Sequence, residues 1–260
     1  MIDFEFVKPL TVADAVKALA AEGAQALSGG QTLTPTMKQR LATPSVLVSL
    51  NGIAAMRGVS VSGGTVTVGA ATTHATVARE ATAYPALAAL AGGIGDMAVR
   101  NRGTMGGSLA NNDPAACYPS AVLGSGATVV TNTRSIAADD FFQGMFTTAL
   151  EEGEIITAVS FPVPLKAAYV KFNQPASRFA LTGVFVAKFA DGVRVAVTGA
   201  SNNGVFRWSE AEAALSASFS AAAIAGLVVP SDDMIADMHG TAAYRANLVK
   251  VLTGRAVTAA

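Results

Sequence analysis

The sequence has few of the residues that usually carry chemistry. It contains one cysteine, Cys117, and two histidines among 260 residues. A single cysteine excludes an internal disulfide, and it also excludes an iron–sulfur cluster held by this chain alone, because such clusters usually take four thiolates. Two histidines leave little for a zinc site. We therefore predict no metal in this chain, and we expect any redox chemistry to use a bound organic cofactor or a partner's metal.

An excess of charge of one sign is also missing. Eighteen Lys and Arg side chains balance eighteen Asp and Glu side chains. Binding to a phosphate backbone rests on a basic excess, so we expect no nucleic acid partner. Charged residues make up 14% of the chain and hydrophobic residues 51%. This apolar composition indicates contacts with other subunits.

No uninterrupted apolar run is long enough to cross a membrane. The best candidate, residues 180–200, contains Lys188, Asp191 and Arg194, whereas a spanning helix needs about 20 predominantly apolar residues. The first nine residues lack a basic segment followed by an apolar one, so we expect no secretory signal. These patterns predict no integral membrane segment and, by default, a cytoplasmic location.

The first 165 residues mix strand and helix patterns. Up to Asn51-Gly52 the predicted order is strand, helix, strand, loop, helix, strand. Valines then alternate around Ser62-Gly63-Gly64, which is typical of a β-hairpin. Further helices are predicted at 73–80, 85–91 and 140–146, and strands at 127–131 and 155–161.

A second pattern follows Pro162 and Pro164. Strands are predicted at 169–172, 181–189 and 193–198, and Asp191-Gly192 joins the last two as a hairpin turn. From Trp208 the pattern is helical to about residue 225, with another helix start at 231–233 and a helix over 241–252 that ends at Gly254. The fold class is therefore α+β.

The first of two glycine-rich segments is Ser28-Gly29-Gly30-Gln31-Thr32, between a predicted strand and a predicted helix. Backbone without side chains suits an anion such as pyrophosphate, because converging N–H groups meet no obstructing Cβ atom. An ordinary β–α turn explains the same glycines, since glycine is frequent in any turn. Both interpretations stay open at this point.

The second segment runs from Thr104 to Pro114 and is rich in glycine and polar side chains. Such a loop suits pyrophosphate and sugar hydroxyls, and a long surface loop is the alternative. Neither segment has the spacing of a Walker A or G-x-G-x-x-G motif, which disfavours a P-loop or a Rossmann fold.

Both segments resemble a known family. Leu27 to Leu33, with Met37-Lys38 and Arg40-Leu41, is similar to the A-G-G-Q-S-L…M-K-x-R-L segment of the FAD-binding medium subunits of molybdenum hydroxylases, the xanthine dehydrogenase and carbon monoxide dehydrogenase family. Residues 94–114 resemble the family's I-G-D-x-x-V-R-N-x-G-T-x-G-G-S…D-P run almost letter for letter. Residues 69–73, 176–180 and 241–252 also fit, so the resemblance spans nearly the whole chain.

The resemblance implies an FAD-binding domain over residues 1–170, with subdomains at about 1–55 and 56–170, and a C-terminal domain over 171–260. It implies that the two segments hold the FAD pyrophosphate, with the isoalloxazine beside Ile94 and Gly95. The implied cofactor-binding residues are Ser28, Gly29, Gly30, Gln31, Thr32, Leu33, Ile94, Gly95, Thr104, Gly106, Gly107, Ser108, Asn111, Asp113, Cys117 and Lys171.

The chain departs from the family at Cys117, where relatives commonly carry the second aspartate of D-P-x-x-D. The missing carboxylate is expected to remove one hydrogen bond to the cofactor. We expect the cysteine to be a small buried apolar side chain.

Other polar residues near these segments allow two interpretations. Arg100 and Arg102 either balance phosphate charge or dock a partner, or they form a solvated pair. His74 is expected to be structural or at the surface, because no second metal ligand lies four residues on. Tyr118 and Trp208 are expected to pack in the core.

The resemblance also implies a function. FAD in this chain would take electrons from [2Fe-2S] clusters of a small subunit and pass them to an external acceptor, while a large subunit with a molybdenum–pterin cofactor oxidises the substrate. The complex would be a dimer of heterotrimers. No catalytic side chain is expected here, because FAD supplies the chemistry. The alternatives are a self-contained flavin oxidase and a flavin-free assembly subunit.

Overall fold

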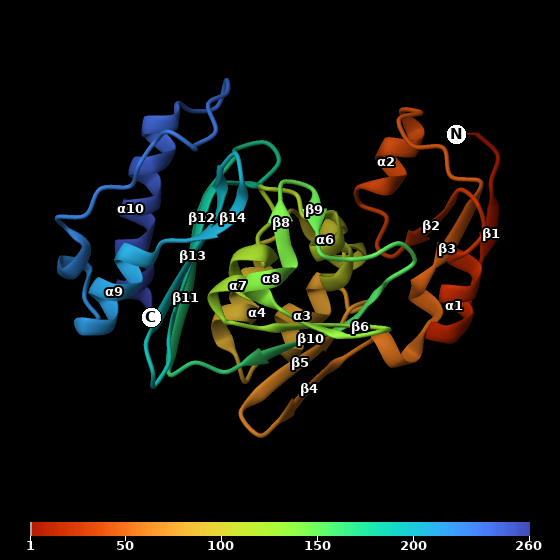
Figure 1. Ribbon diagram of the computed structural model, residues 1–260, viewed down its shortest axis with the longest axis horizontal. Coiled ribbons are helices and arrows are strands. Elements are labelled where there is room, and N and C mark those ends of the chain that lie inside the picture. The colour runs from red at the N-terminus through yellow and green to blue at the C-terminus, as the bar shows by residue number, and fades with distance from the viewer. Residues whose placement is uncertain (1) are drawn as a thin grey trace.

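The computed structural model describes residues 2–260 and combines helices with four β-sheets. Figure 1 shows the first sheet at one end of the molecule, a central sheet covered by helices, and a last sheet with the C-terminal helix at the other end. This arrangement confirms the predicted α+β class.

The N-terminal sheet has three parallel strands in the order β1-β3-β2. Because parallel strands end at one edge, the first glycine segment leaves the sheet there, directly after β2. Thr11 caps the first helix through a side-chain bond from Asp14 N, as the sequence predicted. The elements are β1 (Glu5–Val7), α1 (Val12–Leu19), β2 (Ala24–Leu27), α2 (Leu33–Lys38) and β3 (Val46–Ser49).

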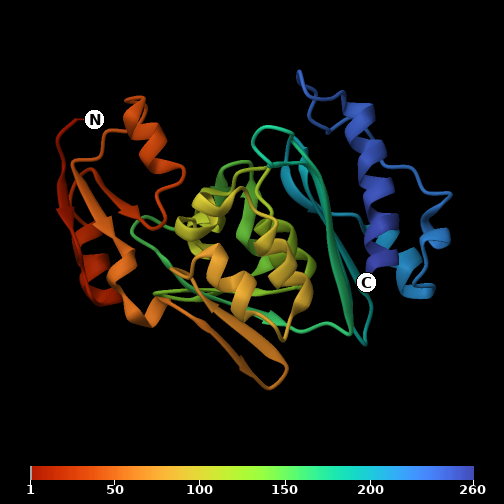
Figure 2. The ribbon, with the colours of Figure 1, turned by 180° about the vertical axis from the view of Figure 1, so that it is seen from behind.

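The central sheet has five strands in the order β4-β5-β10-β6-β7, and all of its pairs are antiparallel. Helices cover one face of it, which Figure 2 shows from behind. The strands are β4 (Val59–Ser62), β5 (Thr65–Gly69), β6 (Thr128–Thr131), β7 (Ser135–Ala137) and β10 (Ile156–Pro162), and the helices are α3 (His74–Glu80), α4 (Pro85–Gly92), α5 (Met97–Arg102), α6 (Met105–Asn111) and α7 (Tyr118–Gly124).

The C-terminal sheet has four antiparallel strands in chain order. Helix α7 packs on one face, α10 packs on the other, and a separate hydrophobic cluster fills the space beneath α10. The division of the chain near residue 170 stays a prediction. The elements are β11 (Lys166–Asn173), β12 (Ala180–Lys188), β13 (Val193–Ser201), β14 (Gly204–Arg207), α9 (Ser209–Ala217) and α10 (Ala242–Ala259).

Residues 104–111, predicted as part of a long loop, are mostly helical. Thr104 caps α6 by accepting a hydrogen bond from Gly107 N, and Met105 and Leu109 are fully buried. Burial of these two side chains outweighs the poor helix propensity of two glycines, which costs about 1 kcal/mol each. Helices α5 and α7 were not predicted either.

The predicted helix at 140–146 is wrong. A short helix α8 (Ala138–Phe141) gives way to β8 (Phe142–Gly144), which pairs with β9 (Thr147–Thr148). Asn112 explains the difference, because its Nδ2 donates to Gly144 O at 2.7 Å and to Thr147 O at 2.8 Å. These bonds fix a turn with Phe146 at φ 55°, which a helix cannot contain.

Two further helix predictions in the C-terminal region are wrong. No helix starts at residues 231–233, where Met234 instead forms a β-bridge with Ser201. Helix α10 does not end at Gly254 but continues to Ala259. Buried Ala256 and Val257 in its last turn hold it on the sheet, and this packing outweighs the low helix propensity of glycine.

The central core allows a direct test of packing. Phe161 in β10 is fully buried and meets the ring of Tyr84 edge-on. Phe161→Ala is expected to lower the free energy of unfolding by about 3–5 kcal/mol, because it leaves a cavity. Val61→Ala, at a side chain 57% exposed in β4, should cost less than about 1 kcal/mol. Urea unfolding followed by circular dichroism measures both, and equal losses would contradict this account of the core.

Candidate functional site

A cavity of about 620 Å³ is lined by residues that follow β2, by residues of α6 and by Lys171 near the end of β11. The structure brings all of the predicted cofactor-binding residues into its walls, although their contact with a cofactor stays a prediction. They are Ser28, Gly29, Gly30, Gln31, Thr32, Leu33, Ile94, Gly95, Thr104, Gly106, Gly107, Ser108, Asn111, Asp113, Cys117 and Lys171.

The first glycine segment touches the main chain that leads directly into the second segment. A Cβ atom on Gly29 would overlap Arg102 O and would lie 2.7 Å from Gly103 Cα. Ser28 Oγ and Thr104 Oγ1 share a hydrogen bond of 2.8 Å beside this contact. Only glycine permits this approach, so the two segments form one continuous wall.

The first segment presents main-chain donors without partners. Within residues 2–260 no hydrogen bond uses the N–H of Gly30, Gln31, Thr32 or Leu33. Gly30 has φ +72°, in the left-handed region that glycine adopts without strain. Four adjacent unpaired N–H groups at a cavity wall suit an anion that accepts several hydrogen bonds.

The second segment plays a different part, because its first donors are already used. Met105 N donates to Thr72 O at 3.1 Å, and Gly106 N donates to Ala70 O at 2.8 Å. These bonds anchor α6 to the segment that follows β5 of the central sheet. The segment therefore presents a fixed surface of small residues whose first main-chain N–H groups are not free.

The loop between α4 and α5 is held by two cations. Lys171 Nζ donates to Gly93 O at 2.8 Å, and Arg100 Nη1 donates to Ile94 O and Gly95 O at 3.0 Å each. Because these peptide bonds are trans, the N–H of Gly95 points away from Arg100. No acceptor within residues 2–260 takes that N–H. Arg100 is therefore half-buried and tied to this loop through Nη1, and its part in balancing phosphate charge or docking a partner stays a prediction.

Lys171 also contacts Cys117, the residue at which the sequence departs from the family pattern. Its Nζ lies 3.4 Å from Cys117 Sγ and donates to Arg178 O at 2.8 Å. Cys117 is 5% exposed, so its predicted burial is confirmed. Its surroundings are not purely apolar, because an ammonium group lies against the sulfur.

His74 lines the same cavity and is buried, with Nδ1 lacking a partner within residues 2–260. Burial, and secondarily the charge of Arg100, lower the pKa of His74 to about 4. The ring is therefore neutral near pH 7 and packs edge-on against Tyr118, which is also fully buried. No group of three or more His, Cys, Asp or Glu side chains among the described residues is arranged to hold a metal.

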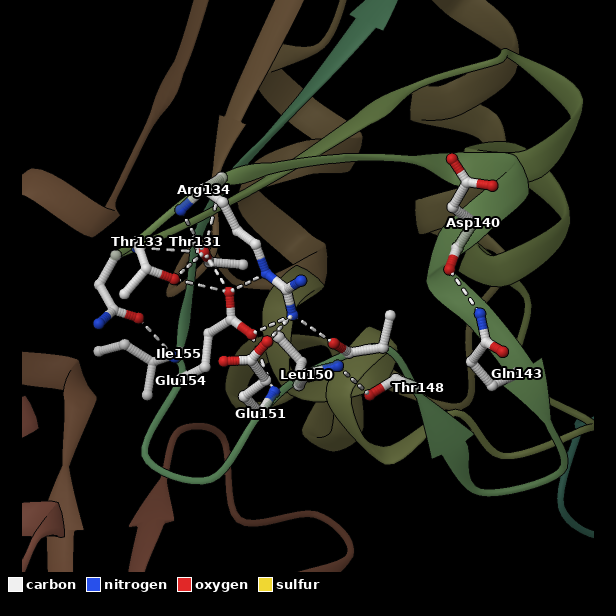
Figure 3. Close-up of polar contacts among 12 residues, drawn as sticks. Thr131, Thr133, Arg134, Asp140, Gln143, Thr148, Leu150, Glu151, Glu154 and Ile155 are labelled. Carbon is white, nitrogen blue, oxygen red and sulfur yellow. Dashed lines mark hydrogen bonds and ion pairs between the residues drawn. The ribbon is translucent and has the colours of Figure 1, made fainter.

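Sequence analysis missed a further part of the wall, formed by Leu150, Glu154 and Ile155 before β10. Figure 3 shows Glu154 held by Arg134, whose Nε and Nη2 donate at 3.0 and 2.9 Å, and by Thr131 Oγ1 at 2.6 Å. The hydrogen bonds from Arg134 are the main reason why the pKa of Glu154 lies well below its usual range. No local motif marks these residues, because their partners lie about 20 residues away in the chain.

Comparisons with known proteins agree with this geometry. Residues 2–164 match the family described as "FAD binding domain in molybdopterin dehydrogenase". The chain is 35% identical to the nicotine 6-hydroxylase medium subunit of Paenarthrobacter nicotinovorans, over 98% of this chain and 96% of the relative. It is 32% identical to the carbon monoxide dehydrogenase medium chain of Afipia carboxidovorans, over 98% and 95%.

Solved structures give the same result. The reconstituted CO dehydrogenase from Oligotropha carboxidovorans contains a chain that matches with a TM-score of 0.90 and 31% identity, over 99% of this chain and 98% of that one. Fold and site together define an FAD-binding flavoprotein. The chain belongs to the family of FAD-binding subunits of the molybdopterin dehydrogenases. This confirms the resemblance drawn from the two glycine segments, and FAD as the cofactor.

No helix within residues 2–260 has both the length and the apolar character to span a membrane.

The buried His74 makes a testable contribution to stability. Between pH 6.5 and 4 the unfolded chain binds more protons at His74 than the folded chain does, so stability should fall as the pH falls through this range. The loss amounts to about 2 kcal/mol between pH 7 and 5. His74→Gln should remove this part of the pH dependence, as measured by urea unfolding at both pH values. Parallel curves for the two proteins would show that His74 is not the group responsible.

Proposed function

We propose that this chain is the electron-transfer subunit of a heterotrimeric molybdenum hydroxylase. In this proposal FAD takes electrons from [2Fe-2S] clusters of a small subunit and passes them to an external acceptor. A large subunit with a molybdenum–pterin cofactor oxidises the substrate. The observation that carries the proposal is a single cavity, walled by both glycine segments, in a chain similar to medium subunits over nearly its whole length.

The residues of the cavity fit FAD. The four unpaired N–H groups of Gly30, Gln31, Thr32 and Leu33 would bind the pyrophosphate, whose oxygens accept several hydrogen bonds. The fixed surface at Gly106, Gly107 and Ser108 would lie against it, because no Cβ at the glycines blocks the approach.

The isoalloxazine end of the site would lie beside Ile94 and Gly95. Arg100 holds the carbonyls of this pair, which fixes the main chain against which the ring would rest. Lys171 would stand near the ring as a positive charge. Asn111, Asp113 and Cys117 complete the proposed binding residues. FAD, when bound, supplies the redox chemistry that these side chains lack, and the protein contributes binding, orientation and electrostatics.

The partners follow from the same similarity. The relatives are named medium subunit and medium chain, so we infer a large molybdenum-binding and a small iron–sulfur partner, assembled as a dimer of heterotrimers. A self-contained oxidase would need an acid or base beside the substrate. The candidates for that role, His74 and Cys117, are both buried, which favours the subunit over the oxidase.

Gly107 tests the assignment of the cavity to FAD. A Cβ atom there would lie 2.9 Å from Thr104 Oγ1 and 3.6 Å from Ser28 Cβ. Gly107→Val should place a branched side chain between the two segments and reduce bound FAD at least tenfold, as measured by visible absorbance. Gly226→Val is the control, because nothing lies within 4 Å of a Cβ at that position. Full FAD content in folded Gly107→Val protein would refute the assignment.

Purification from the native cell tests the proposed assembly. With a tag on this chain, we expect two further polypeptides, molybdenum and iron to co-purify with FAD, as measured by mass spectrometry and metal analysis. FAD in a chain that purifies alone and without metals would instead indicate a self-contained oxidase. A complex without flavin absorbance, even after FAD is added, would indicate an assembly subunit.

A further inference from the structure

Lys171 uses all of its hydrogen-bond donors on the protein. Its ammonium group contacts Gly93 O at 2.8 Å, Arg178 O at 2.8 Å and Cys117 Sγ at 3.4 Å. A lysine ammonium has three N–H donors. The side chain therefore has no proton left to donate to a cofactor, and it acts on the cavity through its charge.

No carboxylate neutralises this charge. Within residues 2–260, none of the ion pairs involves Lys171, and its one side-chain partner is the sulfur of Cys117. The two carboxylates in the cavity walls have other partners. Asp113 Oδ1 accepts from Ala115 N at 2.8 Å, and Glu154 is paired with Arg134. The side chain in contact with the ammonium group is thus a cysteine rather than a carboxylate.

Lys171 is half-buried, and uncharged side chains lie on the buried side of its ammonium group. The hydroxyl groups of Tyr118 and Tyr169 are buried and have no partner within the described chain. The neighbouring His74 is neutral near pH 7, so it adds no charge of its own. A half-buried charge is screened less by water than a fully exposed one.

We propose that Lys171 is an un-neutralised positive charge that raises the reduction potential of the FAD bound in this cavity. This inference rests on the proposed place of the isoalloxazine beside Ile94 and Gly95. Reduction adds two electrons from an external reductant and one proton from water, so the ring gains one negative charge. Lys171 stabilises that charge, and no bond to the lysine forms or breaks.

Position 117 allows the charge to be tested without removing the lysine. Cys117→Asp adds a carboxylate beside Lys171, and Cys117→Asn adds a side chain of the same shape without charge. In the FAD-loaded full-length chain, the two-electron reduction equilibrium of Cys117→Asp should be at least tenfold less favourable than that of Cys117→Asn. Tenfold corresponds to about 30 mV for a two-electron couple, which redox titration against a reference dye resolves.

Lys171→Met provides an independent test that does not depend on a buried carboxylate. The substitution removes the charge and keeps a side chain of similar length. The two-electron reduction equilibrium of FAD in Lys171→Met should be at least tenfold less favourable than in the wild-type protein. If Cys117→Asp does not fold, this variant decides the proposal by the same criterion.

Three results would overturn the proposal. They are equal potentials in Cys117→Asp and Cys117→Asn, an unchanged potential in Lys171→Met, and a potential in Cys117→Asn that exceeds the wild-type value. The last would reveal a thiolate that already neutralises Lys171. FAD content is measured in every sample, so a failure of the charge effect with FAD fully bound is distinct from a failure of FAD binding.

Discussion

The site depends on the main-chain contact between Gly29 and the Arg102-Gly103 peptide. A methyl group at Gly29 would push the first glycine segment away from the peptide that precedes the second, because it would overlap Arg102 O. The contact joins the N-terminal sheet to the helices of the central domain, and the hydrogen bond between Ser28 and Thr104 lies beside it. Without it, the free N–H groups of one segment and the small-residue surface of the other would not share a cavity.

Cations set the shape and the charge of the opposite wall. Arg100 and Lys171 hold the carbonyl groups of residues 93–95, and Lys171 also holds Arg178 O in the turn between β11 and β12. The C-terminal sheet therefore reaches the cavity through Lys171 and through residues 177–179 of the turn that follows β11. The ammonium group of Lys171 therefore has two roles. It holds the loop through hydrogen bonds, and it carries the positive charge that the cofactor would meet.

The residues predicted to bind the cofactor line one cavity, whereas several elements predicted around them differ in the structure. Every residue expected at the cofactor lines the cavity, since the two segments carry the family's most specific motifs. The helix predicted at 140–146 failed because Asn112 binds the turn at 144–147. The helical state of α6 was missed because it depends on burial of Met105 and Leu109.

The sequence by itself determined the family, the α+β class, the cofactor and the residues that meet at the cavity, because these follow from local motifs. Tertiary structure alone decided which donors stay free, what Lys171 contacts and how Glu154 enters the wall. Most of these features depend on partners 20 to 78 residues apart in the chain, and one contact of Lys171 spans seven residues. Their geometry arises only when separate elements pack, and no local pattern encodes it.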